Sequence, residues 1–486
     1  MPDDTGDEKS QTSELQMTTD PITPPLEPAP ETPPPEKGPK TEKGFWASVK
    51  TVLTYRSYSV YLVTSWILGI FGIIMESYLM LFLRDFMLLH IPDPNFVYIA
   101  IGLFIVLFMT IELVARFFGG YVGDNYNRKW LSVLTMAISG VGMLILGLST
   151  NISVLLTGGL IMSGSALVAS GSTAYIYEQM PQEHSGLAMG IFQTSSGFGL
   201  IGLGLVTYFL AIGISFVATI QLVFLIGSIC YFIAAAIRTA FLAPAIPIKR
   251  ENQEKNRARE FLRQNANAFK LLSIILPTFM AVLILDALSD GFYRFVSILY
   301  LNEALAFTYG EISLMLIIVL AFSIPLSITV GGFFDKRGSR RAILIVYSVM
   351  PITLLLLILA PVFPYWLPSN LVNPLVAMFP VLEPLLSTAF IAIAMKRIND
   401  ILWMTLILTY LRKAMPRSET AKMLSIFMIV IMLAFIITPV PSALLYTYLG
   451  AIPVLSVALV LNLIIIGVLI FANIEPKPIP EEYQNL

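Results

Sequence analysis

The chain has 486 residues, of which 56% are hydrophobic and 13% are charged, and its mean hydropathy is +0.79. In soluble domains about a quarter of all residues are charged. The composition of this chain therefore excludes most soluble enzymes, disordered proteins and nucleic-acid binders. The 30 basic and 31 acidic residues nearly cancel, which gives no reason to expect a polyanionic partner. The sequence therefore predicts an integral membrane protein whose surroundings are the lipid bilayer.

The polar parts of the chain lie at its ends and near its middle. Residues 1–43 are rich in proline and predict a disordered cytoplasmic tail rather than a signal peptide. Residues 44–57 carry apolar side chains at helical spacing, which predicts an amphipathic helix on the membrane surface. The charged stretch 244–270 is expected to be a cytoplasmic helical linker, and 474–486 a second cytoplasmic tail.

Twelve stretches have the roughly 20 apolar residues that a membrane-crossing helix needs. They lie at about 58–83, 95–122, 130–149, 152–177, 186–210, 214–242, 271–301, 310–334, 341–361, 385–411, 421–446 and 450–473. The predicted fold is an all-α membrane protein with twelve transmembrane helices in two pseudo-symmetric six-helix bundles, 58–243 and 271–473.

Lys and Arg concentrate in one set of loops and are absent from the loops on the opposite side. Cytoplasmic loops keep positive charge, so both termini are predicted to be cytoplasmic, with the cell membrane as the expected location. Arg84, at the end of the first span, is the one exception to this pattern.

An internal repeat supports the two-bundle layout. The chain reads GGYVGDNYNRK at 119–129 and GGFFDKRGSRR at 331–341, and a second pair of similar phrases lies at 174–192 and 409–427. The two offsets differ, and the second half has extra length at 362–384, which is expected to form an outer cap.

The two loop copies resemble the signature of the major facilitator superfamily, and the resemblance covers about 58–473. It implies a secondary transporter that moves a small organic solute by alternating access, as a monomer and without a cofactor or metal. It also implies that loop residues latch the inner gate. These residues are Gly120, Asp124, Arg128 and Lys129 in the first copy and Asp335, Arg340 and Arg341 in the second. The alternative is that the basic residues only set the membrane topology.

Nine ionisable residues stand out inside predicted spans, where each costs about 2.5–3.5 kcal/mol unless it is paired or faces water. They are Glu76, Glu112, Arg116, Asp286, Asp290, Arg294, Lys396, Arg397 and Asp400. Residues four apart share a helix face, which predicts the pairs Glu112–Arg116, Asp290–Arg294 and Lys396–Asp400. Glu112 and Arg116 are expected to be a gate or structural pair, and Lys396 with Asp400 is either a structural staple or part of the solute site.

Glu76, Asp286 and Arg397 remain, which is two acids against one base. A carboxyl without a counter-charge favours its neutral form at low dielectric. If the three residues meet in one cavity, one acid carries a proton through part of the cycle. Glu76 and Asp286 are therefore the proton-coupling candidates, with Asp290 in reserve.

Matching LFL at 81–83 to LYL at 299–301 places Glu76 opposite Arg294. By the resemblance, spans one, four, seven and ten line the central cavity. The predicted solute-binding residues are Arg294, Lys396, Arg397 and Asp400. The positive charges of the first three favour an anionic or zwitterionic solute.

The prediction is thus a proton-coupled secondary transporter. The alternatives are a uniporter that uses the same charges structurally and a non-transporting receptor or scaffold. The sequence contains no phosphate-binding loop, zinc-binding helix or nucleophile elbow, so no enzyme activity is expected.

Overall fold

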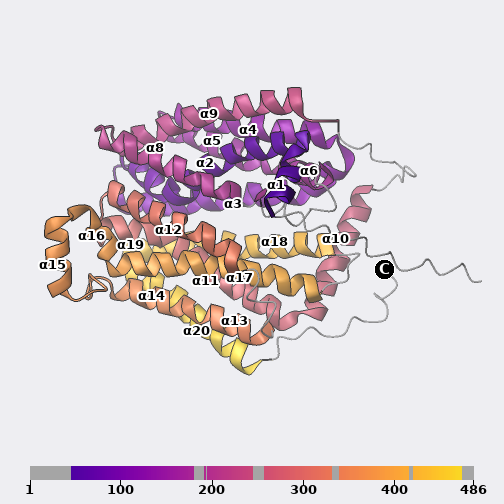
Figure 1. Cartoon of the computed structure of the whole chain (residues 1–486). Coiled ribbons are helices and arrows are strands. Elements are labelled where there is room, and N and C mark those ends of the chain that lie inside the picture. The colour runs from indigo at the N-terminus through magenta and orange to yellow at the C-terminus, as the bar shows by residue number, and fades with distance from the viewer. Residues whose placement is uncertain are drawn as a thin grey trace, which may run out of the picture. The chain divides into compact units, whose positions relative to one another are not determined.

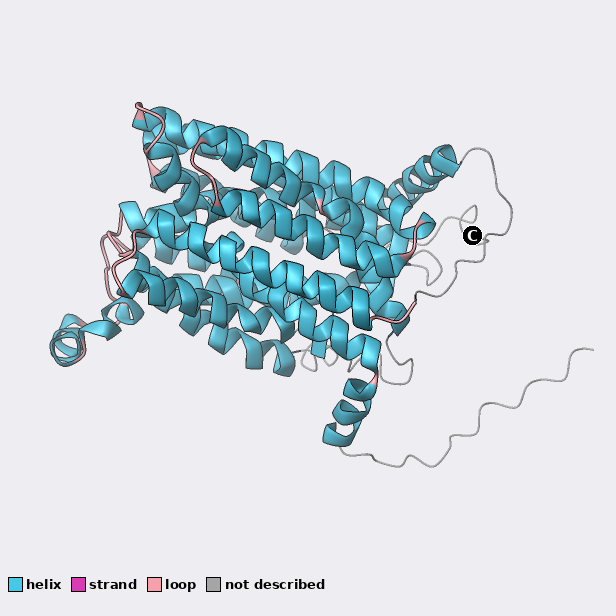
Figure 2. Cartoon of the chain, turned by 90° about the horizontal axis from the view of Figure 1, so that it is seen from above, coloured by secondary structure: helices cyan, strands magenta, loops and turns pink. Residues whose placement is uncertain are grey.

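The computed structural model describes residues 45–179, 191–192, 194–244, 257–330, 339–414 and 420–472. By its internal contacts the chain divides into Met1–Trp46 and Ala47–Leu486, and the second unit contains both bundles. Its described residues form helices joined by short connections (Figure 2). The predicted tails at 1–43 and 474–486 lie outside the described residues.

The helices of the first bundle occupy one side of this unit and those of the second bundle the other (Figure 1). The N-terminal half contains α2 (Arg56–Leu88), α3 (Pro94–Asn125), α4 (Arg128–Gly147), α5 (Ile152–Gly164), α6 (Ala166–Gln179), η2 (Thr194–Phe198), α8 (Gly199–Ala211) and α9 (Phe216–Phe241). The C-terminal half contains α11 (Pro277–Glu303), α12 (Tyr309–Val330), α13 (Ser339–Tyr347), α14 (Val349–Leu359), α17 (Thr388–Ala414), α18 (Thr420–Ile437), α19 (Pro439–Leu449) and α20 (Ala451–Phe471). Over the described residues, every predicted span falls on one helix or on consecutive pieces, which confirms the predicted fold class.

Seven of the described helices are long and apolar enough to cross a membrane, or eight if the bent pair at Leu276 counts as one span. Three shorter apolar helices lie within α8, α12 and the α13–α14 pair. The tenth predicted span is α17, which carries three charged residues in its apolar stretch. Such charges need partners in the bilayer, and α17 finds them in the site described below.

Two further helices overlap the segments 44–57 and 244–270, for which a surface helix and a linker are expected. The helix α1 (Phe45–Thr54) falls within the predicted amphipathic segment. The helix α10 (Arg257–Ile275) forms the second part of the predicted linker, and residues 245–256 of that linker lie outside the described residues.

The insertion at 362–384 folds into α15 (Ser369–Met378), η3 (Pro380–Leu382) and α16 (Glu383–Leu386). Tyr365 donates a hydrogen bond of 2.7 Å to Glu383 in this insertion, and the contact raises the pKa of Tyr365. Figure 1 places α15 and α16 at one end of the bundles and α10 at the other. We call these the cap end and the linker end.

Side-chain oxygens fix where several spans begin. Asp93, Asn127 and Asn151 each accept a hydrogen bond from a backbone N–H in the first turn of α3, α4 and α5. Such caps satisfy amide groups that the helix itself cannot. The loops next to these caps therefore define sharp helix ends.

The two halves pack together along α3 with α18 and α19, α8 with α12, and α2 with α11. Gly102 on α3 permits one close approach, because a Cβ atom there would lie 2.8 Å from the Pro439 carbonyl oxygen and from the Ala443 Cβ of α19. Small residues serve this purpose in membrane helix packing. A single buried apolar cluster includes side chains from both halves.

Candidate functional site

A cavity of about 270 Å³ lies between the two halves. Its walls come from α2, α3 and α8 on one side and from α11, α12 and α17 on the other. The lining residues are Ile73, Met75, Glu76, Ser77, Leu79, Met80, Ile105, Met109, Leu203, Asp290, Tyr293, Arg294, Ser297, Ile298, Leu316, Val319, Leu320, Ile393, Lys396, Arg397 and Asp400. Spans one, seven and ten line it as expected, whereas no described residue of span four (α5 and α6) is in the lining.

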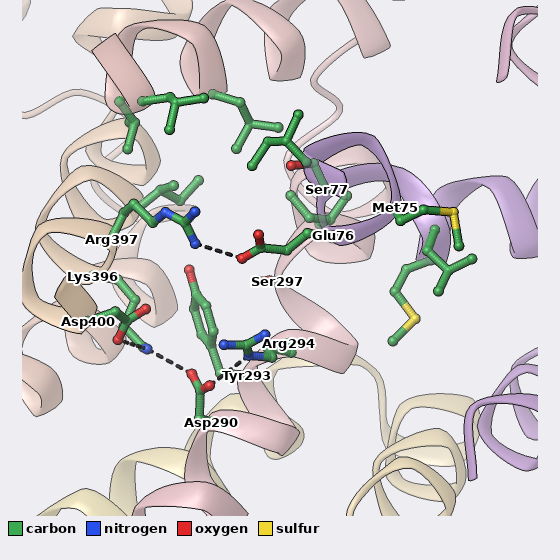
Figure 3. A pocket seen from close by; sticks show the side chains of 18 of the residues that line it. Met75, Glu76, Ser77, Asp290, Tyr293, Arg294, Ser297, Lys396, Arg397 and Asp400 are labelled. Atoms are coloured by element: carbon green, nitrogen blue, oxygen red, sulfur yellow. Dashed lines mark hydrogen bonds and ion pairs between the residues drawn. The ribbon is translucent and has the colours of Figure 1, made fainter. Parts of the chain in front are cut away.

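Four charged residues of α11 and α17 form a chain of ion pairs (Figure 3). Arg294 donates to Asp290 at 2.7 Å and Lys396 donates to Asp400 at 2.5 Å, so these two predicted helix-face pairs are present. Lys396 also reaches Asp290 at 2.8 Å, which joins the two helices. The side chain of Lys396 is only 5% exposed, so its two carboxylate partners compensate a desolvated charge.

Glu76 and Arg397 form an ion pair across the cavity. The Arg397 Nη1 lies 2.7 Å from the Glu76 Oε1, and this contact joins α2 of the N-terminal half to α17 of the C-terminal half. Figure 3 shows the two side chains pointing toward one another. Their side chains are 42% and 31% exposed, so this pair is accessible from the cavity.

Asp286 does not meet Glu76 and Arg397, contrary to the expectation that all three share one cavity. It lies one helical turn from Asp290 and is not among the lining residues. Its two oxygens instead accept hydrogen bonds from Tyr347 at 2.9 Å and from the Trp403 indole at 2.7 Å. Side chains of α13 and α17 thus enclose this carboxyl within the C-terminal half.

This placement changes the charge count. The cavity lining contains three acids and three bases, so its formal charge is zero when all six are ionised. The surplus acid is Asp286, and among the described residues it forms no ion pair.

Two guanidinium groups in the cavity have unused donors. Arg294 uses its Nε for Asp290, and Arg397 uses its Nη1 for Glu76. A guanidinium has five N–H donors, and the remaining nitrogens of both groups make no hydrogen bond to any described residue. The Arg294 side chain is 53% exposed, which leaves it open to a ligand.

A second network joins the halves at the cap end. Arg84 of α2 donates to Asp85, Asn302 and Glu303 at 2.7–2.8 Å, and its guanidinium also reaches the Tyr309 hydroxyl. Glu303 accepts further hydrogen bonds from Tyr98 of α3 and Tyr446 of α19. The Arg84 side chain is 6% exposed. Arg84, the exception to the loop charge pattern, is thus explained by this buried network.

Arg238 of α9, which is not among the residues predicted from the sequence, is fully buried in the N-terminal half. Its guanidinium donates to Thr64, Ser65, Ser132 and Ser172 and lies 4.1 Å from the centre of the Tyr61 ring. Among the described residues it has no acidic partner. Hydroxyl oxygens and an aromatic face therefore replace a carboxylate as the compensation for its charge. Its position near the end of an apolar span was the available signal.

The other predicted residues that the structure describes lie toward the linker end. Arg116 pairs with Glu112 at 2.6 Å, as predicted, and the side chain of Arg116 is 50% exposed. Arg128 begins α4 and its Nε donates to the Gly123 carbonyl, while Gly120 lies within α3 and Lys129 within α4. Asp335 and the side chains of Asp124, Arg340 and Arg341 lie outside the described residues.

Comparison with known proteins identifies the fold. A family model described as Major Facilitator Superfamily matches residues 93–401. A D-xylose-proton symporter is similar in structure with a TM-score of 0.63 and 13% identity, and the match covers 87% of this chain and 98% of that one.

Two more solved structures are similar. A human organic anion transporter, MFSD10, matches with a TM-score of 0.58 and 13% identity over 86% of this chain and 99% of that one. A POT family transporter in complex with 5-aminolevulinic acid matches with a TM-score of 0.60 and 14% identity over 85% and 96%. None of the curated protein sequences matches significantly. The chain belongs to the major facilitator superfamily, as its loop motifs predicted, and is a secondary transporter rather than an enzyme.

Proposed function

We propose that this transporter moves a small organic anion or zwitterion together with a proton by alternating access. The observation that carries the proposal is the Glu76–Arg397 ion pair, which joins the two halves and is open to the cavity. A cavity of about 270 Å³ lies near the lower end of the volumes usual for small-molecule sites. The solute is therefore small.

The ion pair supports a simple coupling scheme. An anionic solute group competes with Glu76 for Arg397. Once the solute displaces Glu76, that carboxylate has lost its counter-charge in a site of low dielectric, and it takes up a proton. Solute binding and proton binding thereby favour each other, and the loaded cavity keeps the same net charge as the empty one.

Asp286 is the second proton-coupling carboxyl in this proposal. The Tyr347 hydroxyl has one proton but lies within hydrogen-bond distance of two acceptors, Asp286 at 2.9 Å and Asn462 at 2.6 Å. A proton on Asp286 that is donated to Tyr347 frees the tyrosine proton for Asn462. The charged groups that interact electrostatically with the Asp286 carboxyl are Asp290 and Lys396.

Asp290 is the reserve candidate, but its surroundings favour a structural role. Both of its oxygens are engaged by cations, one by Lys396 and the other by Arg294. Protonation of Asp290 would leave those two cations without their shared partner, which is costly at low dielectric.

The transport cycle in this proposal alternates the two ends of the cavity. The Arg84–Glu303 network holds the halves together at the cap end. The loop motif residues Gly120, Asp124, Arg128 and Lys129, with Asp335, Arg340 and Arg341 in the second copy, latch the linker end in the opposite state. Of the two roles expected for Glu112 and Arg116, we propose the structural one, because their exposed pair lies within α3 and outside the cavity.

The charge pattern of the loops orients this cycle in the membrane. We place the linker end and both termini in the cytoplasm and the cap end outside the cell, with the transporter acting as a monomer in the cell membrane.

Uptake into liposomes tests the function. A thermal-shift screen of organic anions and zwitterions on the purified protein supplies a stabilising solute, which is then followed as a radiolabelled probe with and without a proton gradient. Coupled transport predicts accumulation driven by the gradient in the unaltered protein, and its loss in Glu76→Gln.

Two results would redirect the proposal. Equal uptake with and without the gradient identifies a uniporter. The absence of solute counterflow, in which internal unlabelled solute exchanges for external label, identifies a receptor or scaffold.

A further inference from the structure

We infer that the solute is an amphiphilic organic anion, with a carboxylate that binds Arg294 and Arg397 and an apolar body of a few carbon atoms. This inference rests on the proposed function, because it assigns a chemical class to the solute of the same cavity. Polar and apolar side chains divide between the helices that line the cavity, and this division supports the inference.

Three of the six helices that line the cavity contribute apolar side chains only. Every lining residue from α3, α8 and α12 is an aliphatic or methionine side chain: Ile105, Met109, Leu203, Leu316, Val319 and Leu320. The charged residues come from α11 and α17, apart from Glu76 on α2. A solute that fills this space must present an apolar surface to α3, α8 and α12 and a charge to α11 and α17.

The charged side chains of α11 and α17 offer more free hydrogen-bond donors than free acceptors. Arg294 and Arg397 each engage one nitrogen in an ion pair, so four N–H groups of each guanidinium remain for a ligand. The oxygens of Asp290 are both occupied. Guanidinium groups bind carboxylates through two parallel hydrogen bonds, which makes a carboxylate the matching head group.

Other solute classes fit the cavity less well. A polyol would bring hydroxyl groups against the apolar side chains of α3, α8 and α12, where they find no partner. An organic cation would find the three acids of the lining already paired with Arg294, Lys396 and Arg397. The hydroxyl groups of a polyol and the charge of an organic cation would thus remain without partners. Both parts of an amphiphilic anion find matching side chains.

Binding of matched probes to the full-length purified protein tests this inference. We propose calorimetric titration with butanoate, pentanoate and hexanoate, and with hexan-1-ol, hexylammonium and 6-aminohexanoate as controls. Each added methylene that enters an apolar site strengthens binding about fourfold, so affinity should rise steadily from butanoate to hexanoate. The neutral and cationic probes should bind at least tenfold more weakly than hexanoate.

Variants assign the effect to the cavity. Arg294→Gln should weaken hexanoate binding at least tenfold. Arg116→Gln is the matched control, because Arg116 is equally exposed and equally paired with an acid four residues away but lies outside the cavity. It should leave the affinity unchanged. Glu76→Gln should strengthen hexanoate binding, since Arg397 then has no competing carboxylate.

The outcomes separate this inference from the proposed function. If 6-aminohexanoate binds as tightly as hexanoate, or if chain length has no effect, the amphiphilic class is wrong while an anionic or zwitterionic solute stands. If carboxylates bind no better than hexan-1-ol and Arg294→Gln changes nothing, the anionic solute site itself is refuted. Equal losses in Arg294→Gln and Arg116→Gln would also overturn the assignment.

Discussion

Two ion pairs join the halves of this transporter within the described residues, and they differ in almost every physical respect. In the Arg84–Glu303 pair at the cap end the arginine is buried, and the pair is surrounded by further partners, including Asn302, Tyr309 and Tyr446. The Glu76–Arg397 pair in the cavity consists of a single contact between two partly exposed side chains.

The difference indicates how each pair is broken. A buried charge with several hydrogen bonds leaves its partners uncompensated when it is removed, so the cap-end network separates only when the halves move. An exposed pair with one hydrogen bond exchanges partners easily, because water and solute compete for it. We therefore assign closure to the first pair and the response to solute to the second.

A charge that acts inside one half should affect stability rather than the cycle. Arg238 donates hydrogen bonds to side chains of α2, α4 and α6 without contacting the other half. Arg238→Ala removes these bonds and leaves a cavity, and we expect the free energy of unfolding to fall by about 3–5 kcal/mol. Denaturant unfolding in detergent measures this loss. An unchanged unfolding midpoint would show that the hydrogen bonds of Arg238 do not stabilise the N-terminal half.

Removing Arg84 should open the cap end. Arg84→Gln leaves Glu303 and Asp85 without their cation, and removal of a buried, hydrogen-bonded charge costs about 2–5 kcal/mol. We expect the equilibrium to shift toward states with a separated cap end. Spin labels at Leu89→Cys and Val362→Cys, two exposed cap-end positions, in a Cys230→Ser background, report the distance between the halves. An unaltered distance distribution contradicts the closing role.

Replacing Asp286, which lies within the C-terminal half, should affect coupling rather than stability. Asp286→Asn mimics the protonated carboxyl, since its amide can accept from Trp403 and donate to Tyr347. We expect stability to change by less than about 1 kcal/mol, while solute accumulation loses the roughly tenfold gain per unit of pH gradient that one coupled proton supplies. Counterflow in liposomes should persist. Gradient-driven uptake equal to that of the unaltered protein would remove Asp286 from the coupling scheme.

The smallest effect is expected for the exposed pair on α3. Arg116→Gln breaks an ion pair between side chains that are largely solvent-accessible, and such pairs contribute about 0.5 kcal/mol or less to stability. Thermal unfolding of this variant should therefore match that of the unaltered protein closely. A loss of stability as large as that of Arg238→Ala would mean that the exposure of a charged side chain does not determine how much it contributes to stability.

The parts of the site that follow from local geometry could be predicted from the sequence. The pairs Glu112–Arg116 and Asp290–Arg294 depend only on the spacing of residues along one helix. The ion pair between Lys396 and Asp290 depends on how α11 and α17 pack, and no local pattern contains that information.

The position of Asp286 was predicted wrongly for a related reason. The sequence shows that Asp286 shares a helix face with Asp290. It does not show that the cavity ends at Asp290, or that Tyr347 and Trp403 enclose the Asp286 carboxyl. The cap-end network had a usable signal. The match of LFL to LYL also aligns Arg84–Asp85 with Asn302–Glu303, which places these polar residues at the same end of two facing spans.

The most direct test of the account counts protons. In weakly buffered solution near neutral pH, an indicator dye follows the pH as hexanoate binds to the purified protein. If the solute displaces Glu76 from Arg397, the unaltered protein takes up about one proton for each anion bound, and Glu76→Gln takes up none. Proton uptake that is absent from the unaltered protein, or that persists undiminished in Glu76→Gln, contradicts the exchange of partners at Arg397.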